Sequence, residues 1–214
     1  GAECGPIEKS KVWGGLDLSS VNDLTALVLV TEDGGVHPEF WLPAEGLSEK
    51  SRKDRVPYDL WAKQGHLNTT PGRAIEYEFV AEFMRGLFDR CDVQQVAFDR
   101  ALFEHLKPWL VKANFSDDEL EKFVPYGQGT LSMTPALRAL EVKLLGNQLR
   151  HGNHPILEMC AKNAKVVGDS GARKFDKKHQ RGRIDGMVAL AMACGVMPNE
   201  SENIDEFLNN LISG

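Results

Sequence analysis

Three aspartates that are far apart in the chain occupy positions from which their carboxylates could meet. Asp17 and Asp99 each end an apolar run, and Asp185 opens a helical pattern over residues 185–193. Carboxylate oxygens are hard ligands that suit Mg²⁺ or Mn²⁺. Two such cations, roughly 3.5–4 Å apart, can activate a water and stabilise the leaving oxygen of a phosphodiester. The aspartates are therefore candidate metal ligands and catalytic residues of a phosphodiester hydrolase.

Each aspartate also has a simpler interpretation. Asp17 could cap the turn that follows it, and Asp99 could pair with Arg100. Asp185 could be a favourable charge in a first helical turn, worth roughly 0.3–1 kcal/mol. However, a charge inside an apolar strand is costly unless it is paired or bound to metal. Ligand sites also collect at the carboxyl ends of strands in open α/β sheets, so we favour the metal site.

A cationic segment directly precedes Asp185. Its basic residues are Lys174, Lys177, Lys178, Arg181 and Arg183. Cations beside a metal site can hold phosphates without reading bases, so we predict that this segment binds DNA. The alternative is a solvated hairpin, in which case the DNA track would move to Arg52, Lys53 and Arg55.

The elements that must position these residues follow from hydrophobic periodicity and turn signals. Short links make the first three strands an antiparallel meander. The expected strands are residues 12–17, 24–30, 36–42, 93–99 and 123–126, and the expected helices are residues 58–64, 73–90, 102–113, 135–149, 155–164 and 203–212.

This order predicts an α/β fold with a mixed sheet, in which the meander is followed by parallel strands and helices flank the sheet. It is the order of a ribonuclease-H-like fold, in which the first and fourth strands are central neighbours. Asp17 and Asp99 would then project side by side. We expect residues 1–11 to be a linker remnant, 12–198 the nuclease domain, 44–72 a surface insertion with a solvated charge run, and 199–214 a tail helix.

Composition is that of an ordinary globular chain, with 42% hydrophobic and 26% charged residues among 214. The net charge of −6 argues mildly against a protein that wraps nucleic acid by itself. Gly1 stands where an initiator Met would be, so we expect a piece of a longer protein. None of the four cysteines forms a Cys-x-x-Cys pair, and Cys91, Cys160 and Cys194 lie in apolar or helical patterns, which indicates reduced core thiols and a cytosolic compartment. Zinc-ligand spacing, an ATP-binding phosphate loop and a Gly-x-Ser-x-Gly nucleophile motif are not found.

Four segments resemble the nuclease domain of the large terminase subunits of tailed bacteriophages. They are Gly15-Leu16-Asp17-Leu18-Ser19 with Asp23-Leu24-Thr25-Ala26, the 58–72 segment with Tyr58, Trp61 and Thr70-Pro71-Gly72, Phe98-Asp99-Arg100, and residues 181–193 around Ile184-Asp185-Gly186. The last is the most specific, and together the segments cover about residues 12–196.

The resemblance implies a ribonuclease-H-like endonuclease that cuts concatemeric double-stranded viral DNA during genome packaging. It implies Asp17, Asp99 and Asp185 as ligands of two divalent cations, with Asp23 as a less certain neighbour. The implied partners are DNA, a packaging ATPase domain of the same full-length chain, the small terminase subunit and the portal. The implied location is the cytoplasm of the infected bacterial host.

Three alternatives stay open at this point. Another ribonuclease-H-like enzyme, such as a transposase or a Holliday-junction resolvase, would share the three acids. An actin-like nucleotide-binding fold would need a Gly-rich phosphate turn after Asp17, where Leu18-Ser19-Ser20-Val21 stands instead. A non-catalytic module that docks on a portal would need no metal. Magnesium-dependent nicking of a plasmid would separate these functions.

Overall fold

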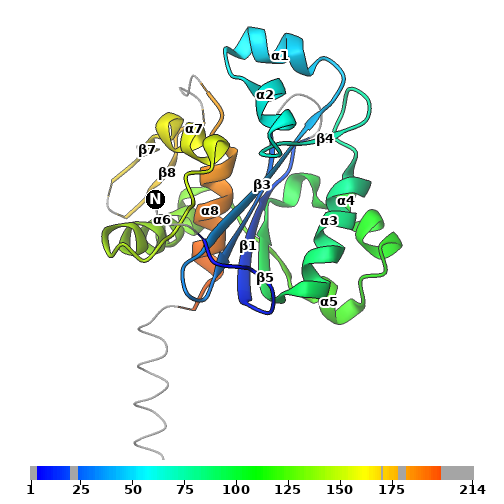
Figure 1. The fold of residues 1–214 in the computed structure, drawn as a ribbon. Helices are drawn as coiled ribbons and strands as arrows, with labels where there is room; N and C mark the ends of the chain where they lie inside the picture. Colours follow the sequence, from blue (N-terminus) through cyan, green and yellow to red (C-terminus); the bar gives the residue numbers. More distant parts are fainter. Residues whose placement is uncertain (1–3, 20–23, 170, 178–181, 199–214) are drawn as a thin grey trace, which may run out of the picture.

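The computed structural model describes residues 4–19, 24–169, 171–177 and 182–198. A six-stranded mixed sheet lies between two groups of helices (Figure 1). In chain order the elements are β1 (Lys11–Asp17), β2 (Thr25–Thr31), β3 (Val36–Pro43), α1 (Leu47–Asp54), α2 (Tyr58–Lys63), β4 (Asn68–Thr70), α3 (Tyr77–Arg90), β5 (Asp92–Phe98), α4 (Arg100–Lys112), α5 (Asp117–Glu121), β6 (Phe123–Pro125), α6 (Thr130–Leu145), α7 (Pro155–Asn163), β7 (Val166–Val167), β8 (Lys174–Phe175) and α8 (Asp185–Val196).

The strand order is β4-β3-β2-β1-β5-β6. The pairs β1–β2 and β2–β3 are antiparallel, whereas β1–β5, β3–β4 and β5–β6 are parallel. Within this sheet β2 alone runs against the other strands, so five strands end at the same edge. The predicted α/β fold is confirmed, including the pairing of the first strand with the strand that precedes Asp99.

Each face of the sheet has its own core. Helices α6, α7 and α8 cover one face, and α3 and α4 cover the other (Figure 1). Along β1, Trp13 belongs to the first core, whereas Val12 and Leu16 belong to the second. The strands are buried from both sides, so β2 reads as a continuous apolar run without alternation.

Helix α8 packs directly on the middle of the sheet because one glycine allows it. A Cβ atom at Gly15 would overlap the carbonyl oxygen of Ala189 in α8. The facing side of α8 is also made of small residues, with Ala189 and Ala193 fully buried. The close approach of β1 and α8 brings the start of the helix to the end of the strand.

Several predicted boundaries were wrong. Helix α3 begins at Tyr77, four residues later than expected, because the Thr70 hydroxyl accepts a hydrogen bond from the Glu76 amide and extends the preceding turn. Helix α6 begins at Thr130 and ends at Leu145, and α4 continues through its proline. Leu144 and Leu145, at the end of α6, are 46% and 85% exposed, because the buried positions of this helix end at Leu140.

The 44–72 segment is more than a surface excursion. Its charge run forms helix α1, in which Lys50 and Asp54 pair at 3.4 Å, and its strand β4 extends the sheet beside β3. Tyr58 of α2 is 1% exposed and packs in the first core. The segment is therefore built into the sheet edge.

Other expectations concern the cysteines, the hairpin and the tail. Cys91, Cys160 and Cys194 are buried free thiols, as predicted. The basic segment for which a solvated hairpin was the alternative begins in the β7–β8 hairpin, where Lys174 lies on β8, while residues 170 and 178–181 lie outside the described part. The expected tail helix, residues 203–212, also lies outside it. Of the helices in the described ranges, none is long and apolar enough to cross a membrane.

Candidate metal centre

The three aspartates lie at the edge where the parallel strands end. Asp17 is the last residue of β1, and Asp99 directly follows β5. The residues before them, Leu16 and Phe98, are paired across the parallel ladder. Asp185 is the first residue of α8, which packs on both of these strands. The fold therefore brings the aspartates to one end of the sheet.

Asp17 is a buried carboxylate among charges of both signs. It is 6% exposed, and burial raises its pKa above the ordinary value. The ammonium of Lys177 and a hydrogen bond from Gln128 act in the opposite direction, and the neighbouring Asp99 raises the pKa further. The site thus holds negative charge that the protein compensates only in part.

Asp185 is also a buried carboxylate with a raised pKa. Burial, followed by the repulsion of Asp17, raises its pKa to about 6. Arg183 and Lys177 favour the charged form but do not outweigh these two effects. Two carboxylates at one edge with raised pKa values are typical of sites that bind a cation or move protons.

Gln128 and Lys177 complete the surroundings of Asp17. The Gln128 amide Nε2 donates a hydrogen bond of 3.0 Å to Asp17 Oδ1, and Lys177 Nζ lies 3.8 Å from Asp17 Oδ2. Lys177 also donates to the Gln128 amide oxygen. The sequence pattern alone did not indicate Gln128, although its position between Gly127 and Gly129, just after β6, marks another strand end at this edge.

The donor chemistry fits a divalent cation. Asp17 presents two oxygens, has two carboxylate neighbours, and already attracts the ammonium of Lys177. Within the ranges that the structure describes, no group of three or more His, Cys, Asp or Glu side chains is close enough to hold a metal ion. The aspartates are therefore neighbours in pairs around Asp17, and their convergence on one shared cation stays a prediction.

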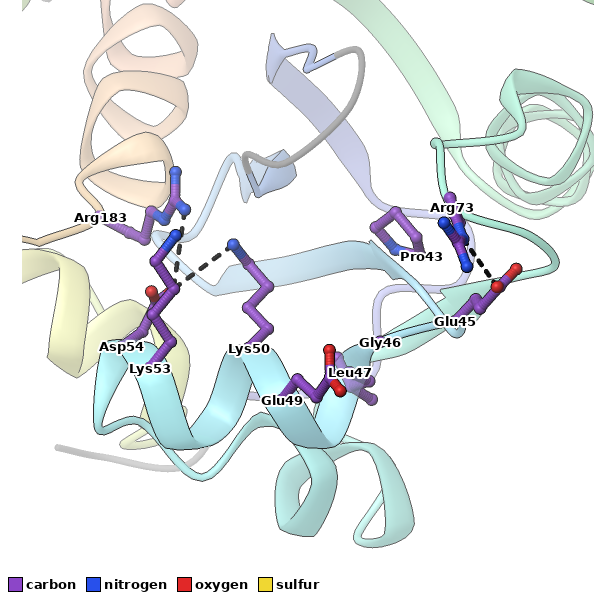
Figure 2. A pocket seen from close by; sticks show the side chains of 10 residues that line it. All are labelled: Pro43, Glu45, Gly46, Leu47, Glu49, Lys50, Lys53, Asp54, Arg73 and Arg183. Carbon is purple, nitrogen blue, oxygen red and sulfur yellow. Dashed lines mark hydrogen bonds and ion pairs between the residues drawn. The ribbon is translucent and has the colours of Figure 1, made fainter.

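A cleft of about 710 Å³ lies near this edge, and both signs of charge line it. Figure 2 shows it between α1, the end of β3 and the segment before α8. Its charged lining consists of Lys50, Lys53, Arg73 and Arg183 together with Glu45, Glu49 and Asp54. A second cleft, of about 450 Å³, shares Lys53 and Arg183 with the first and extends to Lys177. The two clefts form one groove, which begins at α1 and ends at Lys177, the lysine whose Nζ lies 3.8 Å from Asp17 Oδ2.

Ion pairs hold this groove together. Asp54 Oδ2 lies 3.4 Å from Lys50 and 3.7 Å from Arg183, so it links α1 to the start of α8 (Figure 2). The Asn163 amide donates to the Arg183 carbonyl at 3.1 Å, which fixes the backbone there. The Arg73 guanidinium pairs with Glu45 at 2.7 Å.

The remaining predicted residues are only partly described. Lys174 lies exposed on β8, and Lys177 and Arg183 lie in the groove. Asp23, Lys178 and Arg181 fall outside the described residues. Of the alternative DNA contacts, Lys53 lies in the same groove as Arg183, whereas Arg52 and Arg55 line neither cleft, and both DNA tracks stay predictions.

Comparison with known proteins identifies the family. The model of the terminase large subunit, endonuclease domain, matches residues 6–201. The terminase large subunit of Enterobacteria phage HK97 is 43% identical over 205 residues, which are 92% of this chain and 40% of that protein. The terminase large subunit of Lactococcus phage SK1 is 29% identical over 191 residues, or 86% of this chain and 35% of that protein.

Solved structures agree. The crystal structure of the HK97 large terminase has a TM-score of 0.82 at 41% identity, over 92% of this chain and 41% of that one. The nuclease of the large terminase of thermophilic phage G20c with bound magnesium has a TM-score of 0.54 at 11% identity, over 91% and 85%, and thus shares the ribonuclease-H-like fold. This chain spans about two fifths of the HK97 protein. It belongs to the terminase large subunit family and corresponds to the endonuclease domain.

Proposed function

We propose that this chain cuts concatemeric double-stranded viral DNA during genome packaging, by hydrolysis of phosphodiesters that depends on two divalent cations, Mg²⁺ or Mn²⁺. The observation that carries the proposal is the position of Asp17 at the carboxyl edge of the sheet, buried and flanked by Asp99 and Asp185. The G20c nuclease, which has the same fold, has been crystallised with magnesium and with cobalt. That precedent supports a divalent cation here.

Asp17, Asp99 and Asp185 would hold the cations, and Asp23 is a further candidate. Bound there, the cations would activate a water and stabilise the leaving oxygen. The protein's own contribution is to hold carboxylates against their mutual repulsion. The packing of α8 on β1 at Gly15 does this for Asp185, and the β1–β5 ladder does it for Asp99.

The cations of the groove would bind the DNA backbone. Lys177 and Arg183 lie on the path from Lys53 to Asp17, and Lys174 lies exposed on the adjoining hairpin. Lys178 and Arg181 belong to the same proposed contact by sequence. Neutralising Lys53 and Arg183 together should weaken DNA binding on unrelated sequences and flatten its salt dependence by roughly one log–log unit per lost phosphate contact. An unchanged slope would exclude the groove as the DNA track.

The proposed partners follow from the length of the relatives. Because those proteins are more than twice as long as this chain, we propose that a packaging ATPase domain belongs to the same full-length polypeptide. The small terminase subunit and the portal are the further proposed partners, and the host cytoplasm is the proposed location.

Plasmid nicking in Mg²⁺ or Mn²⁺ tests the function. Asp17→Asn and Asp185→Asn should each lower the nicking rate by roughly 10²–10³-fold or more, because each removes charge that stabilises the reacting phosphate through the cations. Asp92→Asn is the matched control, since Asp92 lies exposed at the opposite end of the strand that precedes Asp99. Nicking by Asp17→Asn at the wild-type rate would refute the proposal.

A further inference from the structure

Asp17, Gln128 and Lys177 form a closed set of contacts among three separate segments. Gln128 donates to one oxygen of Asp17, Lys177 lies against the other, and Lys177 donates to Gln128. The segments are the end of β1, the loop between β6 and α6, and the residues that follow β8. Both oxygens that Asp17 could offer to a cation are therefore engaged by the protein itself.

The chemistry of the three groups allows only one arrangement. An ionised carboxylate only accepts hydrogen bonds and an ammonium only donates them. The Gln128 amide must therefore turn its NH₂ group toward Asp17 and its oxygen toward Lys177, which is the orientation observed. Gln128 thus gives the Lys177 ammonium a second acceptor beside the carboxylate.

The backbone near Lys177 is fixed while its side chain has room to move. Phe175 is buried, the Asp176 amide donates to the Lys165 carbonyl at 2.8 Å, and Arg173 pairs with Glu141 of α6 at 2.7 Å. The Lys177 side chain is nevertheless 46% exposed, against 8% for that of Asp17, and it also lines the groove that contains Arg183. It can therefore leave Asp17 for the groove without unfolding the hairpin.

We propose that Lys177 is an exchangeable counter-ion. Without a divalent cation it neutralises Asp17, and a cation that binds Asp17 displaces it into the groove, where it contacts a DNA phosphate. Gln128 is the positioning residue that holds the ammonium in the first state. The inference rests on the proposed function, because it requires the cation site at Asp17, and it adds a coupling between metal loading and DNA binding.

Calorimetric titration of the 214-residue chain with Mn²⁺ alone, in the absence of DNA, tests the competition. Lys177→Met should bind Mn²⁺ roughly three- to tenfold more tightly than wild type, the size expected for removing one partly exposed charge pair. Lys177→Arg keeps the charge and should stay near wild type. Lys165→Met is the control for net charge, because Lys165 is exposed on the same hairpin and lines neither part of the groove.

A second measurement follows the lysine itself. Acylation of amines by a succinimidyl ester, read by mass spectrometry, should be several-fold faster at Lys177 when Mg²⁺ is present, with Lys165 as the internal reference. Equal Mn²⁺ affinity of Lys177→Met and wild type would overturn the counter-ion role. A labelling rate of Lys177 that does not change with Mg²⁺ would overturn it as well. If Asp17→Asn binds Mn²⁺ as wild type does, the metal centre is wrong, and the proposed function fails with it.

Discussion

The carboxylate of Glu119 in α5 and those at the strand edge have opposite electrostatic surroundings. Arg85 of α3 donates from its guanidinium to both oxygens of Glu119 at 2.8 and 2.7 Å, and the Ser116 amide donates a third bond at 2.9 Å. These partners lower the pKa of Glu119 to about 2. At the strand edge, burial and mutual repulsion raise the pKa of Asp17 and bring that of Asp185 to about 6.

The difference distinguishes a carboxylate that stabilises the fold from carboxylates whose charge the fold leaves for a ligand to neutralise. Glu119, whose side chain is 26% exposed, has every strong partner that a carboxylate can use, including the reciprocal bond of a capping box. Among the described residues, the more deeply buried Asp17 has fewer partners and more like charge nearby. Proteins accept such uncompensated burial at sites where a ligand restores the balance. The contrast thus supports a cation at the strand edge.

The largest expected effect on stability concerns the contact of Gly15 with α8, which brings Asp185 to the end of β1. Gly15→Ala should lower the free energy of unfolding by about 3 kcal/mol, because the added Cβ overlaps the backbone of α8 and must push it from the sheet. Gly86→Ala in α3 is the control, since its Cβ meets open space and should stabilise by roughly 0.5–1 kcal/mol. Urea unfolding of both variants measures this. Equal stability of the two variants would mean that α8 does not need the glycine.

Removing the charge of Asp185 and removing that of Glu119 should change the free energy of unfolding in opposite directions. In the absence of divalent cations, Asp185→Asn should stabilise the chain by about 1–3 kcal/mol, because it relieves buried repulsion. Glu119→Gln should destabilise it by about 1–2 kcal/mol, allowing for solvent screening of a partly exposed pair. Urea unfolding at pH 7 in the presence of a chelator measures both changes. Destabilisation by Asp185→Asn would show that the charge of Asp185 stabilises the fold, as that of Glu119 does.

The pH dependence of stability tests the same comparison between Asp185 and Glu119, with smaller expected changes. The pKa of Asp185 is raised from 3.8 to about 6 by folding, so the folded state binds more protons in this interval. Stability should therefore fall as pH rises from about 4 to 6, and this fall should be smaller in Asp185→Asn, in which only the raised pKa of Asp17 continues to act in the same direction. The pKa of Glu119 is lowered from 4.5 to about 2, so its contribution is complete above pH 4.5 and is lost as pH falls.

Thermal unfolding of the metal-free chain across pH 3 to 7 checks both curves. Wild type and Asp185→Asn should diverge toward pH 6, whereas wild type and Glu119→Gln should converge toward pH 3. Parallel curves for all three chains would show that neither carboxylate titrates as its surroundings require.

Much of this fold was predictable because its central strands are long apolar runs with clear ends. Asp17 and Asp99 follow such runs, and Asp185 precedes an almost entirely apolar helix, so their places were readable. Strand β4 was not predictable, because three polar residues carry no periodicity and pair only through tertiary context. The place of Gln128 beside Asp17 was equally hidden, because an uncharged residue in a glycine-flanked loop gives no signal until the strands are aligned.

The central claim is that the acids at the strand edge bind divalent cations, and it is tested most directly by diffraction from crystals of this chain grown with Mn²⁺. Anomalous scattering locates the ions without reference to activity. We expect Mn²⁺ in contact with Asp17 and with Asp99 or Asp185, and the Lys177 ammonium withdrawn from Asp17. Anomalous peaks remote from Asp17, with Lys177 still against its carboxylate at millimolar Mn²⁺, would show that these acids are not a metal centre.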